Sequence, residues 1–198
     1  MLLKSTVRTG LFACGLAVSF AAGSGAFGQA GAARPAAAET STAQPSALTD
    51  PQIAEIAAAA NQIDIDAGRL AERKAHSKDV KAFAKLMVTD HSAVLKQAQQ
   101  LLKKLKVKPE ASAVSKALQS GAKANIAALK KLKGNAFDKH YVDHEVAFHQ
   151  QLLDALDQTL IPGAKNAQLK ALLEKVRPAI ATHLEHAKKV QSELAKKK

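Results

Sequence analysis

The sequence predicts an all-α protein, a four-helix bundle with a crossover and a shorter connecting helix. Through most of the chain, apolar residues recur at steps of three and four, as they do along one face of a helix. Breaks at Ser77, Pro109, Gly134 and Pro162 divide this pattern, and no stretch has the alternation of a strand. Short connections at Ser77 and Pro162 predict two antiparallel hairpins. The middle connection, residues 107–134, is long enough to carry the chain back along the bundle.

The first two helices have clear starts. Thr49 or Asp50 can cap the first helix, and Pro51 suits its first turn. The second helix restarts at Ser77 and ends before Pro109. The apolar stripe of the first helix is Ile53, Ile56, Ala60, Ile63, Ala67 and Leu70, and that of the second is Val80, Phe83, Met87, Val94, Ala98, Leu101 and Leu105.

A glycine and a predicted N-cap mark the boundary between the third and fourth helices. A weaker helical segment, Ala111 to Lys133, stops at Gly134. We expect Asn135 to cap the next helix, with Asp138 completing a capping box. The last helix runs from about Lys165 to Lys196 with the stripe Leu169, Leu172, Val176, Ile180, His183, Ala187, Val190 and Leu194.

The N-terminus has the layout of a secretory signal. Lys4 and Arg8 precede the apolar run LFACGLAVSFAAG, and small residues lead to the GQA at residues 28–30. We expect cleavage after Ala30 and a soluble product exported to a bacterial periplasm, because the apolar run is too short to span a bilayer. Cleavage removes Cys14, the one cysteine of the chain, so we expect no disulfide and no thiol chemistry in the mature protein.

The signal is followed by a tether and a single basic domain. Residues 31–48 are rich in Ala, Pro, Ser and Thr and predict a flexible tether before a bundle domain of residues 49–198. The formal charge of the chain is +12, and no Trp and only one Tyr argue against nucleic acid as a partner. The excess charge is mostly lysine: Lys103, Lys104, Lys106, Lys108, Lys130, Lys131, Lys133, Lys188, Lys189 and the closing KKK. Such a surface either meets anionic envelope polymers, lipid head groups or an envelope protein, or only keeps the protein soluble.

Several polar side chains fall on predicted buried faces. In FDKHYVDHEVAFH, Glu145 lies between two apolar strips and His149 lies within one of them, whereas His140 and Asp143 point away. On the other helices the residues at buried stripes or their edges are Asp64, Asp90, His91 and His183. Counting from the shared end of the bundle, Asp64, His91, Glu145 and His149 lie roughly 15 to 21 Å along their helices, and His183 lies about two turns higher.

Buried polar groups of this kind must have partners, and three interpretations stay open. They form a satisfied polar layer, bind a divalent metal ion, or sense protons through buried histidines. The candidate metal ligands are His91, His149, His183, Glu145, Asp90 and Asp64, a mixed set that suits Zn, Cu or Ni. No carboxylate stands three residues before any histidine, which argues against the Glu-x-x-His motifs of a dinuclear iron site. His183 and His186 are a second candidate pair.

The chain resembles a bacterial family of exported domains of unknown function, family 4142, with a ferritin-like bundle. The matching stretches are IDIDAGRLA, VKAFAKLMVTDH, GNAFDKHYVDHEVAFHQ and PAIATHLEHA. The family pattern falls on Asp90, His91, Phe137, Asp138, Tyr141, His149, Pro178 and His183. The family more often has Glu at Asp64 and Asp66, and Gln at Glu145. The resemblance implies a ferritin-like fold and export, and it brings no activity with it.

Two functions compete on this evidence. The sequence favours a non-catalytic binding or structural module of the bacterial cell envelope, with the lysine surface as its contact and a homodimer as an alternative use of its wide apolar faces. The other hypothesis is a periplasmic metal-binding or metal-dependent redox protein using the inward histidines and carboxylates. No Gly-rich phosphate loop and no nucleophile elbow supports another enzyme class.

Overall fold

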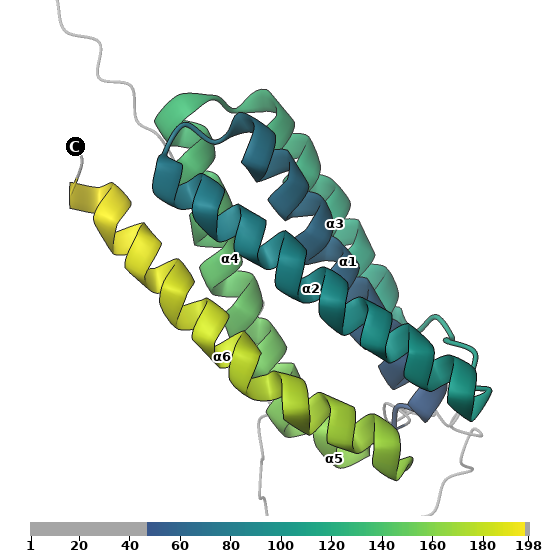
Figure 1. The fold of residues 1–198 in the computed structure, drawn as a ribbon. Helices are drawn as coiled ribbons and strands as arrows, with labels where there is room; N and C mark the ends of the chain where they lie inside the picture. The colour runs from purple at the N-terminus through teal and green to yellow at the C-terminus, as the bar shows by residue number, and fades with distance from the viewer. Residues whose placement is uncertain (1–46, 197–198) are drawn as a thin grey trace, which may run out of the picture. The chain divides into compact units, whose positions relative to one another are not determined.

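The computed structural model describes residues 47–196, and this part of the chain is a bundle of helices without a strand (Figure 1). The all-α prediction is confirmed. The expected signal peptide, Cys14 and nearly all of the tether lie outside the described residues. The helices are α1 (Asp50–Lys74), α2 (Lys78–Leu105), α3 (Ala113–Lys131), α4 (Gly134–Ala155), the π-helical turn η1 (Leu156–Leu160), α5 (Ile161–Gly163) and α6 (Ala167–Lys196).

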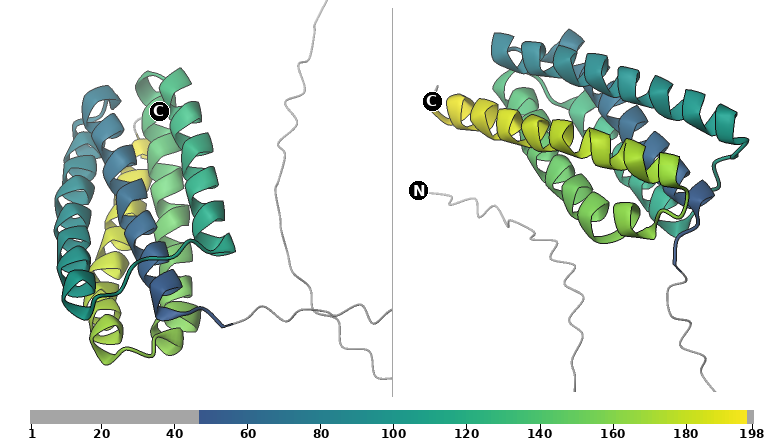
Figure 2. Two further views of the ribbon diagram at one scale, coloured as in Figure 1. Left: turned by 90° about the vertical axis from the view of Figure 1, so that its right-hand side faces the viewer. Right: turned by 60° about the horizontal axis from the view of Figure 1, so that its bottom comes forward.

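The four long helices form two antiparallel hairpins joined by α3. α1 and α2 make the first hairpin, and α4 and α6 make the second, with η1 and α5 at its turn. α3 runs back along the bundle beside α1 and α4, so that α2 and α4 start at the same end (Figures 1 and 2). α3 is therefore the predicted crossover helix.

Two of the predicted helix ends are confirmed in detail. Thr49 caps α1 through a capping box with Gln52, and Pro51 lies in the first turn. At the same end of the hairpin, α2 stops at Leu105, where Lys106 takes a left-handed backbone conformation with φ of 54°. That conformation satisfies carbonyls of the last turn, because the Lys106 N–H donates to them.

The predicted capping box of α4 is wrong. Lys133 is the N-cap of α4, and the Asp138 carboxylate accepts hydrogen bonds from the backbone N–H groups of His76 and Ser77 at 2.9 and 2.7 Å. Asp138 is buried, and the Ser77 side chain makes no capping bond of its own. A carboxylate from α4 therefore satisfies the start of α2, which ties the two hairpins together.

Asp50 does the same at the opposite end of the bundle. Its carboxylate accepts hydrogen bonds from the N–H groups of Lys165 and Asn166, each at 2.8 Å. The first turn of α1 is thus bound to the connection that precedes α6. Each hairpin turn is held by a carboxylate of the other hairpin.

The buried apolar residues lie on both sides of a polar layer. One cluster includes Val80, Phe83, Met87, Phe137 and Val142, and another includes Ile53, Ile56, Leu153, Leu156, Leu160 and Leu173. Along α1 and α4, the buried positions between these two clusters include polar side chains: Asp64 on α1, and Glu145 and His149 on α4. The core therefore sets the height at which polar side chains meet.

Close packing of α1 on α2 requires a glycine. A Cβ atom on Gly68 would lie 2.8 Å from Val88 Cγ2 and 3.0 Å from the Ala84 carbonyl oxygen. A larger residue would push the two helices apart just beyond the polar layer, since real Cβ atoms do not approach so closely.

The surface is basic, as the composition predicted. Lys103, Lys104, Lys106, Lys108, Lys130, Lys131, Lys133, Lys188 and Lys189 are all exposed. Within residues 47–196, no helix is long and apolar enough to cross a membrane.

The Asp138 contact leads to a stability prediction. Asp138→Ala removes two charge-assisted hydrogen bonds and leaves two backbone donors unpaired at the start of α2, so we expect the free energy of unfolding to fall by about 3 kcal/mol. Urea denaturation followed by circular dichroism measures it. Asp154→Ala, which removes an exposed carboxylate of α4, is the control and should change stability by less than about 0.5 kcal/mol. Equal effects of the two changes would contradict the capping role.

Candidate metal centre

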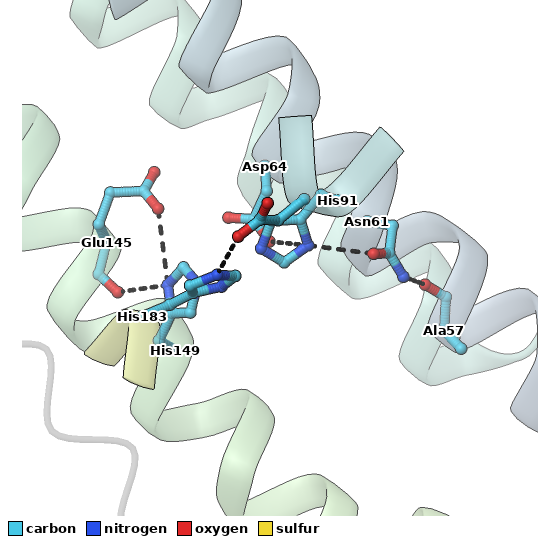
Figure 3. Close-up of polar contacts among 8 residues, drawn as sticks. Ala57, Asn61, Asp64, His91, Glu145, His149 and His183 are labelled. Carbon is cyan, nitrogen blue, oxygen red and sulfur yellow. Dashed lines mark hydrogen bonds and ion pairs between the residues drawn. The ribbon is translucent and has the colours of Figure 1, made fainter. Parts of the chain in front are cut away.

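Three histidines from three helices meet inside the bundle (Figure 3). His91 of α2, His149 of α4 and His183 of α6 are 1%, 0% and 4% exposed. Their ring centroids are 5.2 to 5.6 Å apart, and each ring offers a nitrogen within 4.8 Å of the others. We call these residues the histidine cluster.

The expectation that His183 lies two turns higher is wrong. His149 lies 12 residues before the start of α5, and His183 lies 16 residues after the start of α6, a difference of about one helical turn. The two rings nevertheless meet, with their centroids 5.6 Å apart.

The outer nitrogen of each ring is held by an acceptor. His91 Nδ1 lies 3.0 Å from Asn61 Oδ1, and Asn61 is oriented by its own Nδ2, which donates to the Ala57 carbonyl at 2.8 Å. His149 Nδ1 lies 3.0 Å from the Glu145 carbonyl oxygen, and His183 Nε2 lies 3.0 Å from Asp90 Oδ2. Carbonyl and carboxylate oxygens only accept, so each of these ring nitrogens carries the hydrogen.

The inner nitrogen of each ring is consequently a bare lone pair in the neutral ring. His91 Nε2, His149 Nε2 and His183 Nδ1 are buried and have no hydrogen-bond partner in the described structure. Three unpartnered acceptors from three helices are costly to bury together. This arrangement of an outer nitrogen held by an acceptor and a free inner nitrogen is the one that protein metal sites use to orient histidine ligands.

Burial keeps two of the rings neutral. Desolvation, with the neighbouring histidines adding to it, lowers the pKa of His91 to about 3. Desolvation likewise lowers the pKa of His149 to about 4, although its bond to the Glu145 carbonyl acts in the opposite direction. Both rings are therefore uncharged at neutral pH, the form in which histidine binds metal ions.

Two carboxyl groups lie beside the cluster and form what we call the carboxyl pair, Asp64 of α1 and Glu145 of α4. Both are 1% exposed, and the charge of Asp64 acts on Glu145. Asp64 Oδ2 lies 3.4 Å from His91 Nδ1, and Glu145 Oε2 lies 3.5 Å from His149 Nδ1. With His149 they form a second group of ligand atoms within 4.8 Å of one another.

Burial also makes the carboxyl pair hold protons. Desolvation raises the pKa of Asp64 to about 8, and desolvation together with the charge of Asp64 raises the pKa of Glu145 well above its usual value. Tyr141, one turn from Glu145 on α4, has a buried hydroxyl without a partner, and burial beside these carboxyls raises its pKa. Two protonated carboxyl groups therefore lie next to the outer nitrogens of His91 and His149.

Asp90 takes a different place from the other predicted ligands. Its side chain is 40% exposed, and it contacts the cluster only through the outer nitrogen of His183. It orients His183 and does not belong to the converging atoms. Five of the six predicted candidates thus meet in the interior, and Asp90 lies at the rim.

The other histidines of the described chain stay outside the cluster. His140 bonds Asn125, and His76 is exposed. His186 packs against Phe83 with ring centroids 5.2 Å apart, and among residues 47–196 it belongs to no group of three or more converging metal ligands. His144 stacks on the ring of Phe148, which separates it from His149.

Asn61 is the residue that sequence reasoning missed. It fixes the tautomer of His91, yet its amide looks like an ordinary surface group in the sequence. The available signal was its position three residues before Asp64, which places both side chains on one side of α1.

The ionisation of the site predicts the pH dependence of stability of the metal-free protein. The folded carboxyl pair keeps protons that the unfolded chain loses above about pH 4, so stability falls with rising pH wherever that difference exists. Below about pH 6.5 this is offset, since unfolded His91, His149 and His144 bind protons that the folded rings do not. Between about pH 6.5 and 8 only the carboxyl effect remains, and we expect a loss of about 2 kcal/mol or more.

Urea denaturation at a series of pH values in a chelating buffer measures this loss. The Asp64→Asn, Glu145→Gln double variant should show almost no change from pH 6.5 to 8. A wild-type protein as stable at pH 8 as at pH 6.5 would contradict the buried, proton-holding pair.

Comparison with known proteins agrees with the resemblance in the sequence. No curated protein and no solved structure matches the chain significantly. A family model described as a domain of unknown function, DUF4142, matches residues 34–190, which is more than half of the chain and includes the histidine cluster and the carboxyl pair. The protein is a member of the DUF4142 family.

Proposed function

We propose that this protein binds a divalent transition-metal ion, of the Zn, Cu or Ni group, through the inner nitrogens of His91, His149 and His183. The observation that carries the proposal is the set of three buried lone pairs without partners, each on a ring whose other nitrogen is already committed. A purely structural polar layer would be expected to satisfy these atoms within the protein. Here the hydrogen-bond acceptors from the described part of the protein all contact the outer nitrogens of the three rings, and the inner nitrogens have none.

The carboxyl pair supplies the charge that the ion needs. Three neutral imidazoles leave a divalent cation uncompensated in the interior, and Asp64 and Glu145 form an adjoining group of ligand atoms with His149. Loss of a proton from this pair would leave a carboxylate beside the cluster, and its negative charge would offset that of the ion. Nitrogen-rich sites with one or two oxygens favour Zn, Cu and Ni over Mg and Ca, whose ligands are oxygens.

Only small movements are needed to close such a site. Tetrahedral zinc ligands at about 2.0 to 2.1 Å from the ion lie about 3.3 Å apart. Each of the three rings offers one nitrogen within 4.8 Å of the others, so we expect rotations of the imidazole side chains to draw the ligands together. The hydrogen bonds of the outer nitrogens limit these rotations to a narrow range.

The envelope-binding module that the sequence favoured has weaker support from the geometry. The exposed lysines are distributed over α2, α3 and α6 and do not identify a partner. They are compatible with contact to anionic material, but equally with solubility. Solubility explains the exposed lysines, but it does not explain three buried histidine nitrogens without partners in the described chain.

Metal content is the first test. Wild-type protein purified without chelators or a metal-affinity tag should contain close to one transition-metal ion per chain by elemental analysis. His149→Gln should contain almost none, because it removes an imidazole from the centre of the cluster. His140→Gln, on the same helix and bonded only to Asn125, is the matched control and should keep the metal.

The proposal fails if wild type and His149→Gln have the same trace metal content after exposure to each of the three ions. Circular dichroism of both variants shows whether the helices remain, so that loss of metal is separated from loss of fold.

Thermal stability gives an independent test. A ligand that binds only the folded state at a thousand times its Kd stabilises that state by about 4 kcal/mol. For a domain of this size we expect Zn²⁺ to raise the Tm of metal-free wild type by about 10 °C. Mg²⁺ at the same concentration should leave the Tm unchanged. An equal rise with His149→Gln would place the binding of Zn²⁺ elsewhere.

A further inference from the structure

We propose that the metal ion enters and leaves between α2 and α6, and that Asp90 is the transfer ligand that passes it to His183. This inference rests on the proposed metal-binding function and adds a route and a residue to it. The contact that motivates it is direct: Asp90 Oδ2 lies 3.0 Å from His183 Nε2, with the Asp90 side chain 40% and the His183 side chain 5% exposed. A single hydrogen bond links solvent to the cluster at this place.

Two other sides of the cluster are closed by packing. Towards α3, the rings are covered by Phe148, Ile63 and Ala60, with Leu118, Ala122 and Leu152 packed over them. Between α1 and α2, the close approach at Gly68 leaves no room for a side chain, and the Asn61 amide occupies the space next to His91. An ion that entered by either side would have to pass through apolar contacts and lose its water before meeting a ligand.

The α2–α6 side is packed more loosely. No residue of α2 between His91 and Leu102 is buried, whereas α2 before His91 contributes Phe83, Ala84 and Met87 to the core. About two turns beyond Asp90, an exposed hydrogen bond of 3.4 Å from Lys175 Nζ to Gln97 Oε1 links the two helices. Such a contact breaks readily in water, so these parts of α2 and α6 can separate without disrupting the core.

Pro178 adds to this freedom. It lies inside α6, five residues before His183, and it cannot donate the backbone hydrogen bond that a helix requires at that position. α6 is therefore weakened at the height where it would have to bend away from α2.

The chemistry of Asp90 suits a transfer ligand. It is an exposed carboxylate on a protein with a formal charge of +12, so it offers local attraction to a cation where the overall field repels it. Binding a hydrated ion there would release His183 from its hydrogen bond, and rotation of the ring would bring a nitrogen to the ion. After transfer, the ion lies among the inner nitrogens and Asp90 again accepts from His183.

The experiment compares rates with final occupancy. Co²⁺ is mixed with metal-free protein, and the visible absorption of the bound ion is followed by stopped flow. Asp90→Asn keeps an acceptor for His183 but removes the charge, so we expect loading to slow about tenfold with nearly unchanged occupancy at equilibrium. Asp66→Asn, an exposed carboxylate on α1, is the matched control and should load at the wild-type rate.

A cross-link tests the route itself. In a Cys14→Ser background, Gln97→Cys with Lys175→Cys is joined by a short bismaleimide, which holds α2 to α6. Glu55→Cys with Gln119→Cys, a pair in contact across α1 and α3 at 3.2 Å, is joined in the same way as the control. We expect loading to slow more than tenfold in the first protein and to stay unchanged in the second.

The outcomes separate the two proposals. Normal final occupancy with slow loading only in the α2–α6 cross-link supports the route. Loading at the wild-type rate in that protein, or equal slowing in both cross-linked proteins, overturns it while the metal site stands. Failure of wild type to bind Co²⁺, Zn²⁺, Cu²⁺ or Ni²⁺ at all overturns both.

Discussion

The interior of this bundle depends on where three histidine hydrogens lie. Asn61, the Glu145 carbonyl and Asp90 each accept from the outer nitrogen of one ring, which leaves the inner nitrogens as lone pairs. The rings are neutral because they are buried, they are oriented because their outer sides are bonded, and they converge because α2, α4 and α6 present them at one height.

The fold supplies that height through contacts far from the site. Asp138 and Asp50 bind the turn of the opposite hairpin at the two ends of the bundle, so neither hairpin can slide along the other. The two apolar clusters fill the space above and below the polar layer. A buried polar layer costs stability, and the protein keeps one where well-packed apolar residues would fit. A binding function would explain why the protein keeps this polar layer despite its cost in stability.

Helical periodicity was sufficient to predict the architecture and most of the inward residues. His91, His149 and His183 lie on apolar stripes, and Glu145 lies between two strips. Their burial can therefore be predicted from the rotation of about 100° per residue along each helix. The height of His183 could not be predicted, because it depends on the π-helical turn and on the length of the reversal before α6. The role of Asp138 was also missed, since a carboxylate three residues after Asn135 has the same local pattern whether it caps its own helix or another.

Which nitrogen of each histidine carries the hydrogen is harder still to predict from the sequence. Whether a histidine nitrogen is bonded or free depends on a few tenths of an ångström between helices, and the residues responsible are separated by 30 positions for Asn61 and His91 and by 93 for Asp90 and His183. Such pairs leave no periodic signal. The sequence could therefore offer a satisfied polar layer and a metal site as alternatives, and the free inner nitrogens favour the second.

X-ray absorption at the metal edge of the loaded protein tests the central claim most directly. The account predicts a first shell of nitrogen and oxygen at about 2.0 to 2.1 Å for zinc, with the outer-shell scattering of three imidazole rings. The Asp64→Asn, Glu145→Gln variant should keep the imidazole scattering and lose only oxygen. A shell of oxygen alone, or one imidazole or none, would contradict a centre built from His91, His149 and His183.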